Sequence, residues 1–220
     1  MTNRTRVQLI AAVVVAVFAG GIWLTGGQLH AQWLRFYGAA VFLATIALSL
    51  WEVFIWRFPP VQRLQGVPPN LRGTWRGTLT SLWTDPNMGG LPPPKTVYLV
   101  IRQRASSFSV TLLTNESRSS SFMGQVDTLD GSTTLSYSYR NRPSPSVEHR
   151  SRIHHGSALL DVSGKPAVRL VGRYWTDRDS RGELDFESRS KVAVDDFKAA
   201  EKLFGGERGR WTAQCGNPKR

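Results

Sequence analysis

The chain opens with two long apolar runs and then changes to an alternation of apolar and polar positions. The first run covers residues 7–24 without a charged side chain, and the second covers residues 36–56. Eighteen residues in an α-helix span about 27 Å, close to the roughly 30 Å hydrocarbon core of a bilayer. Tryptophans stand near the ends of both runs, where membrane–water interfaces favour aromatic rings. The pattern predicts two transmembrane helices, at about 7–24 and 36–56, within residues 1–57.

Basic residues predict how this pair of helices is oriented. Arg4 and Arg6 precede the first run and four arginines lie between positions 57 and 76, whereas Arg35 is the only arginine between the runs. By the positive-inside tendency, both termini and everything after the second run face the cytoplasm. The first run is longer than the roughly 7–15 apolar residues of a signal peptide, and a second span follows at once. We therefore expect both helices to be retained.

After a proline-rich linker at residues 58–70, the apolar positions recur with a period of two. The four prolines of this linker argue against regular structure there. Beyond it, short runs rich in β-branched and aromatic residues are separated by Gly, Pro, Asn, Asp or Ser clusters, which is typical of strands joined by turns. The eight expected strands cover residues 74–83, 96–103, 108–114, 119–128, 133–140, 157–162, 167–176 and 182–190.

Eight short strands with hairpin-sized connections predict an all-β domain over residues 71–191. Closure into an up-and-down, lipocalin-like β-barrel would leave no exposed edge strand, and a related sandwich stays open as an alternative. An eight-stranded barrel is either filled by side chains or wide enough for one small ligand near its mouth. Alternation places Tyr137 and Tyr139 on one face of their strand, and Tyr174 and Thr176 on one face of theirs.

A short amphipathic helix is expected after the last strand, over residues 192–205. The pair Gly205-Gly206 is expected to end it, and residues 206–220 are expected to be a disordered tail. The apolar positions that share one helical face are Ala193, Phe197, Ala200 and Phe204.

Charge points to anionic partners. The chain has 28 Lys and Arg against 16 Asp and Glu, a net charge of +12, and the excess persists after the apolar runs. Nucleotides, nucleic acid and lipid head groups are the partners that such an excess suggests. A single cysteine, Cys215, permits no internal disulfide.

The sequence offers little support for catalysis or for a metal. It contains no HExxH, GxSxG, CxxC or GxxxxGK[ST] motif. His149, His154 and His155 are expected to share a solvated loop in which Arg150 and Arg152 would repel a cation. We therefore expect no catalytic residue, no metal ligand and no enzyme, although a membrane-bound hydrolase using Asp177, His154 or His155 remains open.

Two short segments carry the candidate chemistry. RGTWRGTL, residues 72–79, has a Gly-x-Trp at the start of the first strand, a pattern similar to lipocalin-like folds, and predicts that the Trp75 indole packs into the barrel end. GRYWTDRDSRGELDF, residues 172–186, is consistent either with a charged type I turn at residues 177–180 or with a site for an anionic, aromatic ligand. Arginine forks match phosphate oxygens, and tyrosine faces stack on bases. The candidate ligand-binding residues are Arg76, Tyr98, Arg102, Tyr137, Tyr139, Tyr174, Thr176, Arg178 and Arg181.

Two apolar spans, a proline linker and a barrel carrying LRGTWRGTL and GRYWTDRDSRGEL resemble the β-barrel membrane effectors of CBASS anti-phage defence. The resemblance covers the architecture of nearly the whole chain. It implies that a CD-NTase supplies a cyclic oligonucleotide, such as a cyclic dinucleotide, which is a ligand and not a cofactor. It also implies that ligand binding drives homo-oligomerisation and disruption of the bacterial inner membrane, with lipid but no long nucleic acid as a further partner. The matching positions are Gly73, Trp75, Arg76, Gly77, Tyr174, Thr176, Arg178, Arg181 and Gly182.

Another class of function is also consistent with the residues. A membrane-tethered lipocalin-like barrel would bind a lipid or another small ligand, although its arginines would suit an acyl chain poorly. A structural or adaptor membrane protein is the remaining alternative.

Overall fold

The computed structural model describes residues 3–24, 26, 33–84, 90–129, 131–149 and 151–214. The chain divides into two compact units. The helical unit comprises Met1–Asn70 together with Arg104–Ser107, and the barrel unit comprises Leu71–Gln103 together with Phe108–Arg220.

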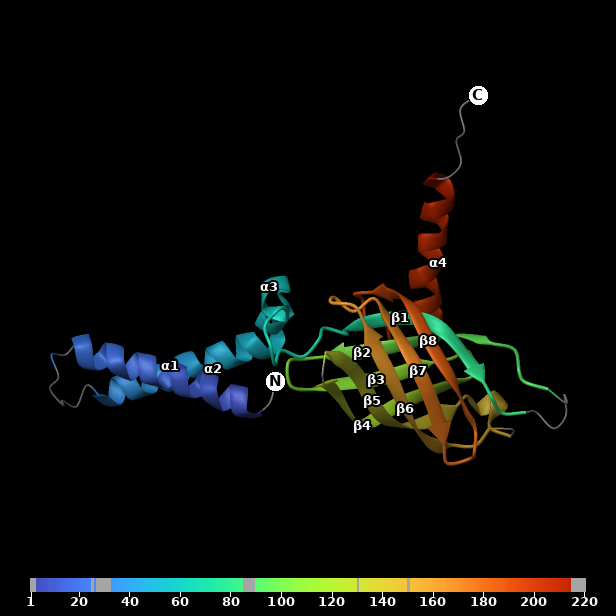
Figure 1. Cartoon of the computed structure of the whole chain (residues 1–220), viewed down its shortest axis with the longest axis horizontal. Helices are drawn as coiled ribbons and strands as arrows, with labels where there is room; N and C mark the ends of the chain where they lie inside the picture. Colours follow the sequence, from blue (N-terminus) through green and yellow to red (C-terminus); the bar gives the residue numbers. More distant parts are fainter. Residues whose placement is uncertain are drawn as a thin grey trace, which may run out of the picture. The chain divides into compact units, whose positions relative to one another are not determined.

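The helical unit contains two long helices, α1 (Asn3–Leu24) and α2 (Trp33–Val53), which pack against each other (Figure 1). Within the described residues, Gly38–Arg57 is long and apolar enough to cross a membrane, and Ala11–Leu24 is a shorter apolar helix. Gly21, Ala40 and Ala44 are buried although most of their apolar neighbours are exposed. Such small residues allow two helix backbones to approach closely.

The linker is more regular than its prolines suggested. A 3₁₀ turn, η1 (Ile55–Arg57), is followed by a single helical turn, α3 (Pro59–Gln62). Pro59 and Pro60 occupy the first two positions of α3. The expectation of irregular backbone fails there because a first helical turn does not need the N–H groups that proline lacks.

The barrel unit is a closed barrel of eight antiparallel strands, which confirms the fold expected from the sequence (Figure 1). Each strand pairs with the next one along the chain, and the last pairs with the first. The strands are β1 (Gly73–Ser81), β2 (Lys95–Gln103), β3 (Phe108–Leu113), β4 (Ser117–Leu129), β5 (Ser132–Pro143), β6 (His154–Ser163), β7 (Arg169–Thr176) and β8 (Arg181–Ser190).

The end of the barrel where the chain enters is filled by Trp75. This side chain is fully buried, and its indole N–H donates a hydrogen bond of 2.9 Å to the Leu71 carbonyl. The Arg189 guanidinium lies 5.0 Å from the centre of the indole ring. Leu99, Ile101, Leu135, Leu160, Leu170 and Phe186 are equally buried in the same core. The packing role expected for Trp75 is confirmed.

Closure at this end depends on Gly73. Its φ of 131° lies in the region that residues with a side chain rarely adopt. A Cβ at this position would lie 2.1 Å from the Ser190 carbonyl oxygen on β8. Only a glycine therefore lets β1 start this close to the end of β8.

The C-terminal helix α4 (Phe197–Gln214) packs its first two turns on the outer face of β2 and β3. Phe197 and Phe204 contact Tyr98, with ring centres 5.2 and 5.8 Å apart. The helix starts later than expected and continues through Gly205-Gly206. A glycine costs a helix only about 1 kcal/mol relative to alanine, so two glycines weaken a helix without having to end it.

Candidate ligand-binding site

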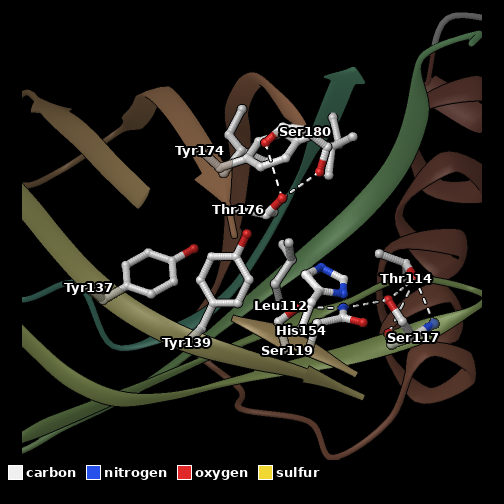
Figure 2. A pocket seen from close by; sticks show the side chains of 13 residues that line it. Leu112, Thr114, Ser117, Ser119, Tyr137, Tyr139, His154, Tyr174, Thr176 and Ser180 are labelled. Atoms are coloured by element: carbon white, nitrogen blue, oxygen red, sulfur yellow. Dashed lines mark hydrogen bonds between the residues drawn. The ribbon is translucent and has the colours of Figure 1, made fainter. Parts of the chain in front are cut away.

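The opposite end of the barrel contains a cavity of about 150 Å³. It lies at the end that carries the β3–β4 and β7–β8 turns, because Thr114 and Ser180 from these turns line it. Figure 2 shows its side chains converging from several strands. The lining residues are Leu79, Leu112, Thr114, Ser117, Ser119, Tyr137, Tyr139, Asn141, His154, Tyr174, Thr176, Ser180 and Leu184.

The polarity of this cavity follows from a gradient along the barrel axis. On β5 the inward positions run from Leu135 through Tyr137 and Tyr139 to Asn141, all of them buried. Since side chains alternate between the two faces of a strand, these four point into the same interior at increasing distance from the closed end. The interior is therefore apolar at the closed end and lined by hydroxyls and an amide near the mouth.

Two groups of hydrogen bonds fix the polar side chains (Figure 2). The Asn141 amide donates to the hydroxyls of Ser117 and Ser119 on β4, at 3.0 and 2.8 Å. On the β7–β8 hairpin the hydroxyls of Thr176 and Ser180 lie 2.7 Å apart. These bonds orient the side chains before any ligand is bound, which lowers the entropy that binding must cost.

Two buried polar atoms of the cavity lining have no hydrogen-bond partner among the described residues. They are the Tyr137 hydroxyl and the Asn141 Oδ1, on side chains that are 4% and 7% exposed. An unsatisfied buried polar group costs about 1–3 kcal/mol, so proteins seldom keep one without a use for it. Both atoms belong to residues that line the cavity, and a ligand with polar edges would satisfy them.

Burial moves the ionisation of the cavity tyrosines to still higher pH. Desolvation raises the pKa of Tyr137 and of Tyr139 above the ordinary value, and the neighbouring Tyr139 and Tyr174 raise them further. Desolvation also raises the pKa of Tyr174, against the effect of a hydrogen bond with Ser81. Each phenol therefore remains a hydroxyl that can both donate and accept a hydrogen bond.

His154 adds a titratable group to the cavity. Its Nδ1 lies 3.0 Å from the Arg152 carbonyl, which can only accept, so the neutral ring carries its proton there and leaves Nε2 as an acceptor. Burial lowers the pKa of His154, and the charges of Arg178 and His155 add to this effect. The Arg152 hydrogen bond and Asp177 act in the opposite direction. The unliganded site thus favours a neutral imidazole.

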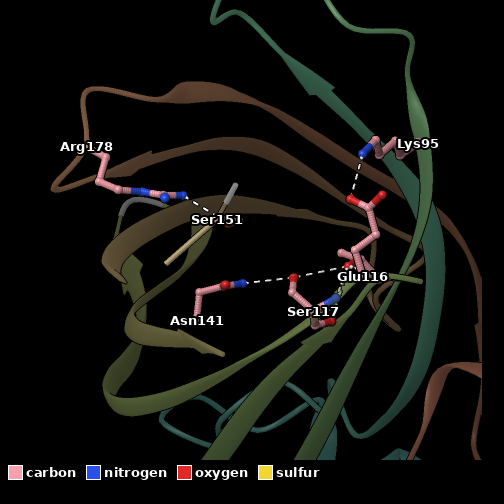
Figure 3. Close-up of polar contacts among 7 residues, drawn as sticks. Lys95, Glu116, Ser117, Asn141, Ser151 and Arg178 are labelled. Carbon is pink, nitrogen blue, oxygen red and sulfur yellow. Dashed lines mark hydrogen bonds and ion pairs between the residues drawn. The ribbon is translucent and has the colours of Figure 1, made fainter. Parts of the chain in front are cut away.

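Cationic side chains stand at the rim. In the β7–β8 turn, the Arg178 guanidinium lies 3.4 Å from the Ser151 hydroxyl and is exposed. Lys95 forms an ion pair of 3.1 Å with Glu116. Figure 3 shows Arg178 and Lys95 on two sides of the mouth, with Asn141 and Ser117 between them. A neutral polar cavity beneath basic rim residues suits a ligand that inserts a base and keeps its phosphates outside.

The structure brings five of the nine sequence-predicted residues to the cavity lining or to the turn at its rim. Tyr137, Tyr139, Tyr174 and Thr176 line the cavity, and Arg178 lies in the turn at its rim. The turn itself places Asp179 in the left-handed region, with a φ of 56°.

The other four predicted residues do not line the cavity. Arg181 pairs in register with the outward-facing Trp175, and Arg76 pairs with Tyr98 on the outer face. Tyr98 is buried beneath α4. Arg102 donates hydrogen bonds to the Val194 carbonyl and to the Asp195 carboxylate, at 3.0 and 2.7 Å. In the structure Tyr98 and Arg102 therefore hold the C-terminal segment.

Sequence reasoning did not name Asn141 or His154 as ligand-binding residues. His154 and His155 were expected in a loop, but β6 begins at His154, so the two rings point to opposite faces of the barrel wall. Continuing the alternation of β5 by two residues beyond Tyr139 would have found Asn141. Continuing that of β6 back from Leu160 would have found His154.

The described part of the chain holds no group of three or more His, Cys, Asp or Glu side chains that could bind a metal ion. Asp177 instead accepts a hydrogen bond of 3.0 Å from the His155 backbone N–H. That bond is the main reason why the pKa of Asp177 lies below its ordinary value, and the nearby His154, His155 and Arg178 lower it further. The Asp177 carboxylate thus links the β7–β8 turn to the start of β6.

Comparison with known proteins adds two findings. The family model described as "Cap15, cyclic dinucleotide receptor domain" matches residues 67–188, which is more than half of the chain. A similar relative is a protein of Staphylococcus schleiferi named "CD-NTase-associated protein 15". It is 22% identical to this chain over 176 residues, which cover 80% of this chain and 88% of the relative.

Proposed function

This chain belongs to the family of Cap15 cyclic dinucleotide receptor domains and is a CBASS effector that binds cyclic nucleotides, and we propose that its ligand binds at the mouth cavity of the barrel. The observation that carries this placement is that two buried polar atoms of the cavity, the Tyr137 hydroxyl and Asn141 Oδ1, have no partner within the described ranges. A nucleobase presents donors and acceptors on its edges, so it is the part of the ligand that fits these atoms. The family resemblance seen in the two short sequence motifs is confirmed.

The size of the cavity determines how such a ligand would sit. At about 150 Å³ it is smaller than the roughly 300–1,000 Å³ of pockets that enclose a whole small-molecule ligand. One base would enter between Tyr137, Tyr139 and Tyr174, and the sugar-phosphate ring would remain at the rim. There Arg178 would contact a phosphate, because a guanidinium forms charge-assisted hydrogen bonds to phosphate oxygens. Arg181, Arg76 and Arg102 would take no part in this arrangement.

The same geometry argues against an acyl chain as the ligand. Hydroxyl, amide and imidazole groups come from all the lining residues of the cavity except Leu79, Leu112 and Leu184. A hydrocarbon would offer no partner to the buried Tyr137 hydroxyl and Asn141 Oδ1, at a cost in free energy for each one.

Membrane disruption is the proposed output. The helical unit would anchor the protein in the bacterial inner membrane through two spans, with both termini and the barrel in the cytoplasm. A cyclic nucleotide made by a CD-NTase would bind the barrel, barrels would self-associate, and the crowded helix pairs would disrupt the bilayer and kill the infected cell. The buried small residues Gly21, Ala40 and Ala44 support close helix packing as part of this step. Catalysis has no part in the proposal.

This proposal is tested by measuring the mass of the full-length protein in neutral detergent by light scattering, with and without each member of a panel of cyclic dinucleotides. We expect the mass per particle to increase several-fold with the nucleotide that binds. The linear, ring-opened form of the same dinucleotide is the control and should leave the mass unchanged. Binding at constant mass would contradict assembly, and failure of every cyclic dinucleotide to bind would contradict the ligand.

A further inference from the structure

A second hollow lies on the outside of the barrel wall, across β4, β5 and β6. It is a groove of about 440 Å³, within the size range of small-molecule pockets. Its lining residues are Ser120, Ser121, Phe122, Arg140, Arg142 and His155.

Strand alternation separates this outer groove from the mouth cavity. On β5, Tyr139 and Asn141 point into the barrel, whereas Arg140 and Arg142 point outward and are exposed. The wall of the barrel therefore stands between the two hollows. A ligand of the outer groove would therefore not contact a ligand in the cavity.

The outer groove concentrates positive charge that the described residues do not neutralise. Arg140 and Arg142 are two residues apart on one strand, so their Cα atoms are roughly 7 Å apart. Arg118 on β4 is the register partner of Arg142, and like charges opposite one another destabilise a sheet. Among the described residues neither Arg140 nor Arg142 has an acidic partner, whereas Arg169 on β7 is paired with Asp185.

An exposed aromatic ring stands beside these arginines. The β4–β5 register shifts between Ser121 and Met123, so Phe122 is the extra residue of a β-bulge. Bulges redirect side chains, and the Phe122 ring reaches across β5 to the ring of His155, with centres 6.2 Å apart and planes at 78°. The side chain nevertheless remains 65% exposed. An aromatic ring held in water beside two guanidiniums is a surface that folding alone does not require.

Small hydroxyls and an imidazole ring complete the groove. Arg140 has Ser120 as its register partner on β4 and His155 on β6. The acid nearest to His155 is Asp177, whose Oδ2 lies 3.6 Å from the imidazole Nδ1. Asp177 also accepts a hydrogen bond from the His155 backbone, so it fixes the position of this ring at the edge of the groove.

We propose that the outer groove is a second binding site, specific for the phosphate and base of a nucleotide. Arg140 and Arg142 bind the phosphate oxygens, which a pair of guanidinium forks matches in geometry and charge. The exposed Phe122 ring stacks on the base, as aromatic side chains do in sequence-tolerant nucleotide sites. A phosphate without a base would use the arginines and leave the ring in water.

The probe for this site is 8-azidoadenosine 5′-monophosphate, cross-linked by ultraviolet light to the full-length protein in neutral detergent. Peptide mapping should find the label on the segments that contain Phe122 and His155. Replacing Arg140→Gln and Arg142→Gln together should reduce this label at least tenfold. The matched double change Arg104→Gln and Arg173→Gln removes the same charge from exposed positions outside the groove and should leave the label intact.

Competition and a cavity variant decide between the possible outcomes. Adenosine 5′-monophosphate should prevent labelling at a concentration at least ten times lower than glycerol 3-phosphate does. The cavity variant Asn141→Asp should still be labelled at the outer groove, whether or not its cavity binds a cyclic dinucleotide. Absence of label from both segments, or equal label in the Arg140 and Arg142 double variant, overturns the site. Equal competition by the two phosphates overturns the nucleotide and assigns the groove to a phosphate head group instead.

Discussion

At the scale of single residues, the interior of the barrel holds polar atoms where packing alone would favour carbon. Tyr137 lies between the apolar core and the mouth, and its hydroxyl has no partner among the described residues. Asn141 uses both amide hydrogens on Ser117 and Ser119, while its Oδ1 has no partner in the described part of the chain. Side chains that destabilise the unliganded fold in this way are expected where a ligand later supplies the missing partners.

Tyr137→Phe is predicted to change stability and affinity in opposite directions. Removing an unsatisfied buried hydroxyl should raise the free energy of unfolding by about 1 kcal/mol, whereas losing a hydrogen bond to the ligand should weaken binding about tenfold. Thermal denaturation and equilibrium binding of the cyclic dinucleotide measure the two effects. Tyr98→Phe, beneath α4, is the control and should leave affinity unchanged. An unaltered affinity in Tyr137→Phe would show that this hydroxyl does not contact the ligand.

Alternation along single strands predicted part of the candidate site and could not have predicted all of it. Tyr137, Tyr139 and Tyr174 line the cavity because only one face of β5 and of β7 is buried. On β2 both faces are covered, the inner one by the core and the outer one by α4. A period of two then gives no sign that Tyr98 faces outward, since its burial matches that of its inward neighbours.

At the scale of elements, α4 forms a second small core on the outside of the barrel. Phe204 and Ala200 are buried against Tyr98, Val100 and Leu113. The segment before the helix is fixed by arginines from two strands. Arg102 binds the Asp195 carboxylate, and Arg118 donates to the carbonyl of the same residue at 2.9 Å. The first turns of α4 are therefore part of the folded barrel unit.

Phe204→Ala is predicted to release α4 without unfolding the barrel. A buried Phe→Ala change costs about 3–5 kcal/mol, which is large for a cluster of so few side chains. Trypsin should then cut at Lys198 and Lys202 much faster than in the wild type, while the strands stay protected. Phe122→Ala, which removes an exposed ring, is the matched control and should not change the cleavage rate. Equal protection of Lys198 in Phe204→Ala would contradict a helix held by this cluster.

The strands were more predictable from sequence than the ends of the elements. Each of the eight expected strands is present, because alternation over six or more residues constrains a strand strongly. The start of β6 was placed three residues late, since His154 and His155 resemble loop residues more than strand residues. The end of α4 was placed too early because a glycine pair is a weak stop signal when no tertiary contact enforces it.

At the scale of the whole molecule, one chain combines a neutral polar cavity, a basic exterior and apolar helices. The net charge of +12 would make copies of the chain repel one another, and an anionic ligand offsets part of that repulsion. Charge repulsion between copies would therefore keep the unliganded receptor dispersed, and ligand binding would weaken that repulsion. In this proposal, association begins when the cyclic dinucleotide binds at the mouth cavity.

The most direct measurement of this claim is the amount of cyclic dinucleotide bound to full-length Asn141→Asp compared with the wild type, by equilibrium dialysis in neutral detergent. The substitution keeps the shape of the side chain and places a negative charge in the cavity beneath the ligand phosphates. Gln125→Glu makes the same change of charge on an exposed strand position and is the control. We predict affinity at least tenfold weaker for Asn141→Asp, a loss of about 1.4 kcal/mol, and none for Gln125→Glu. Equal binding by all three proteins would contradict the mouth cavity as the receptor site.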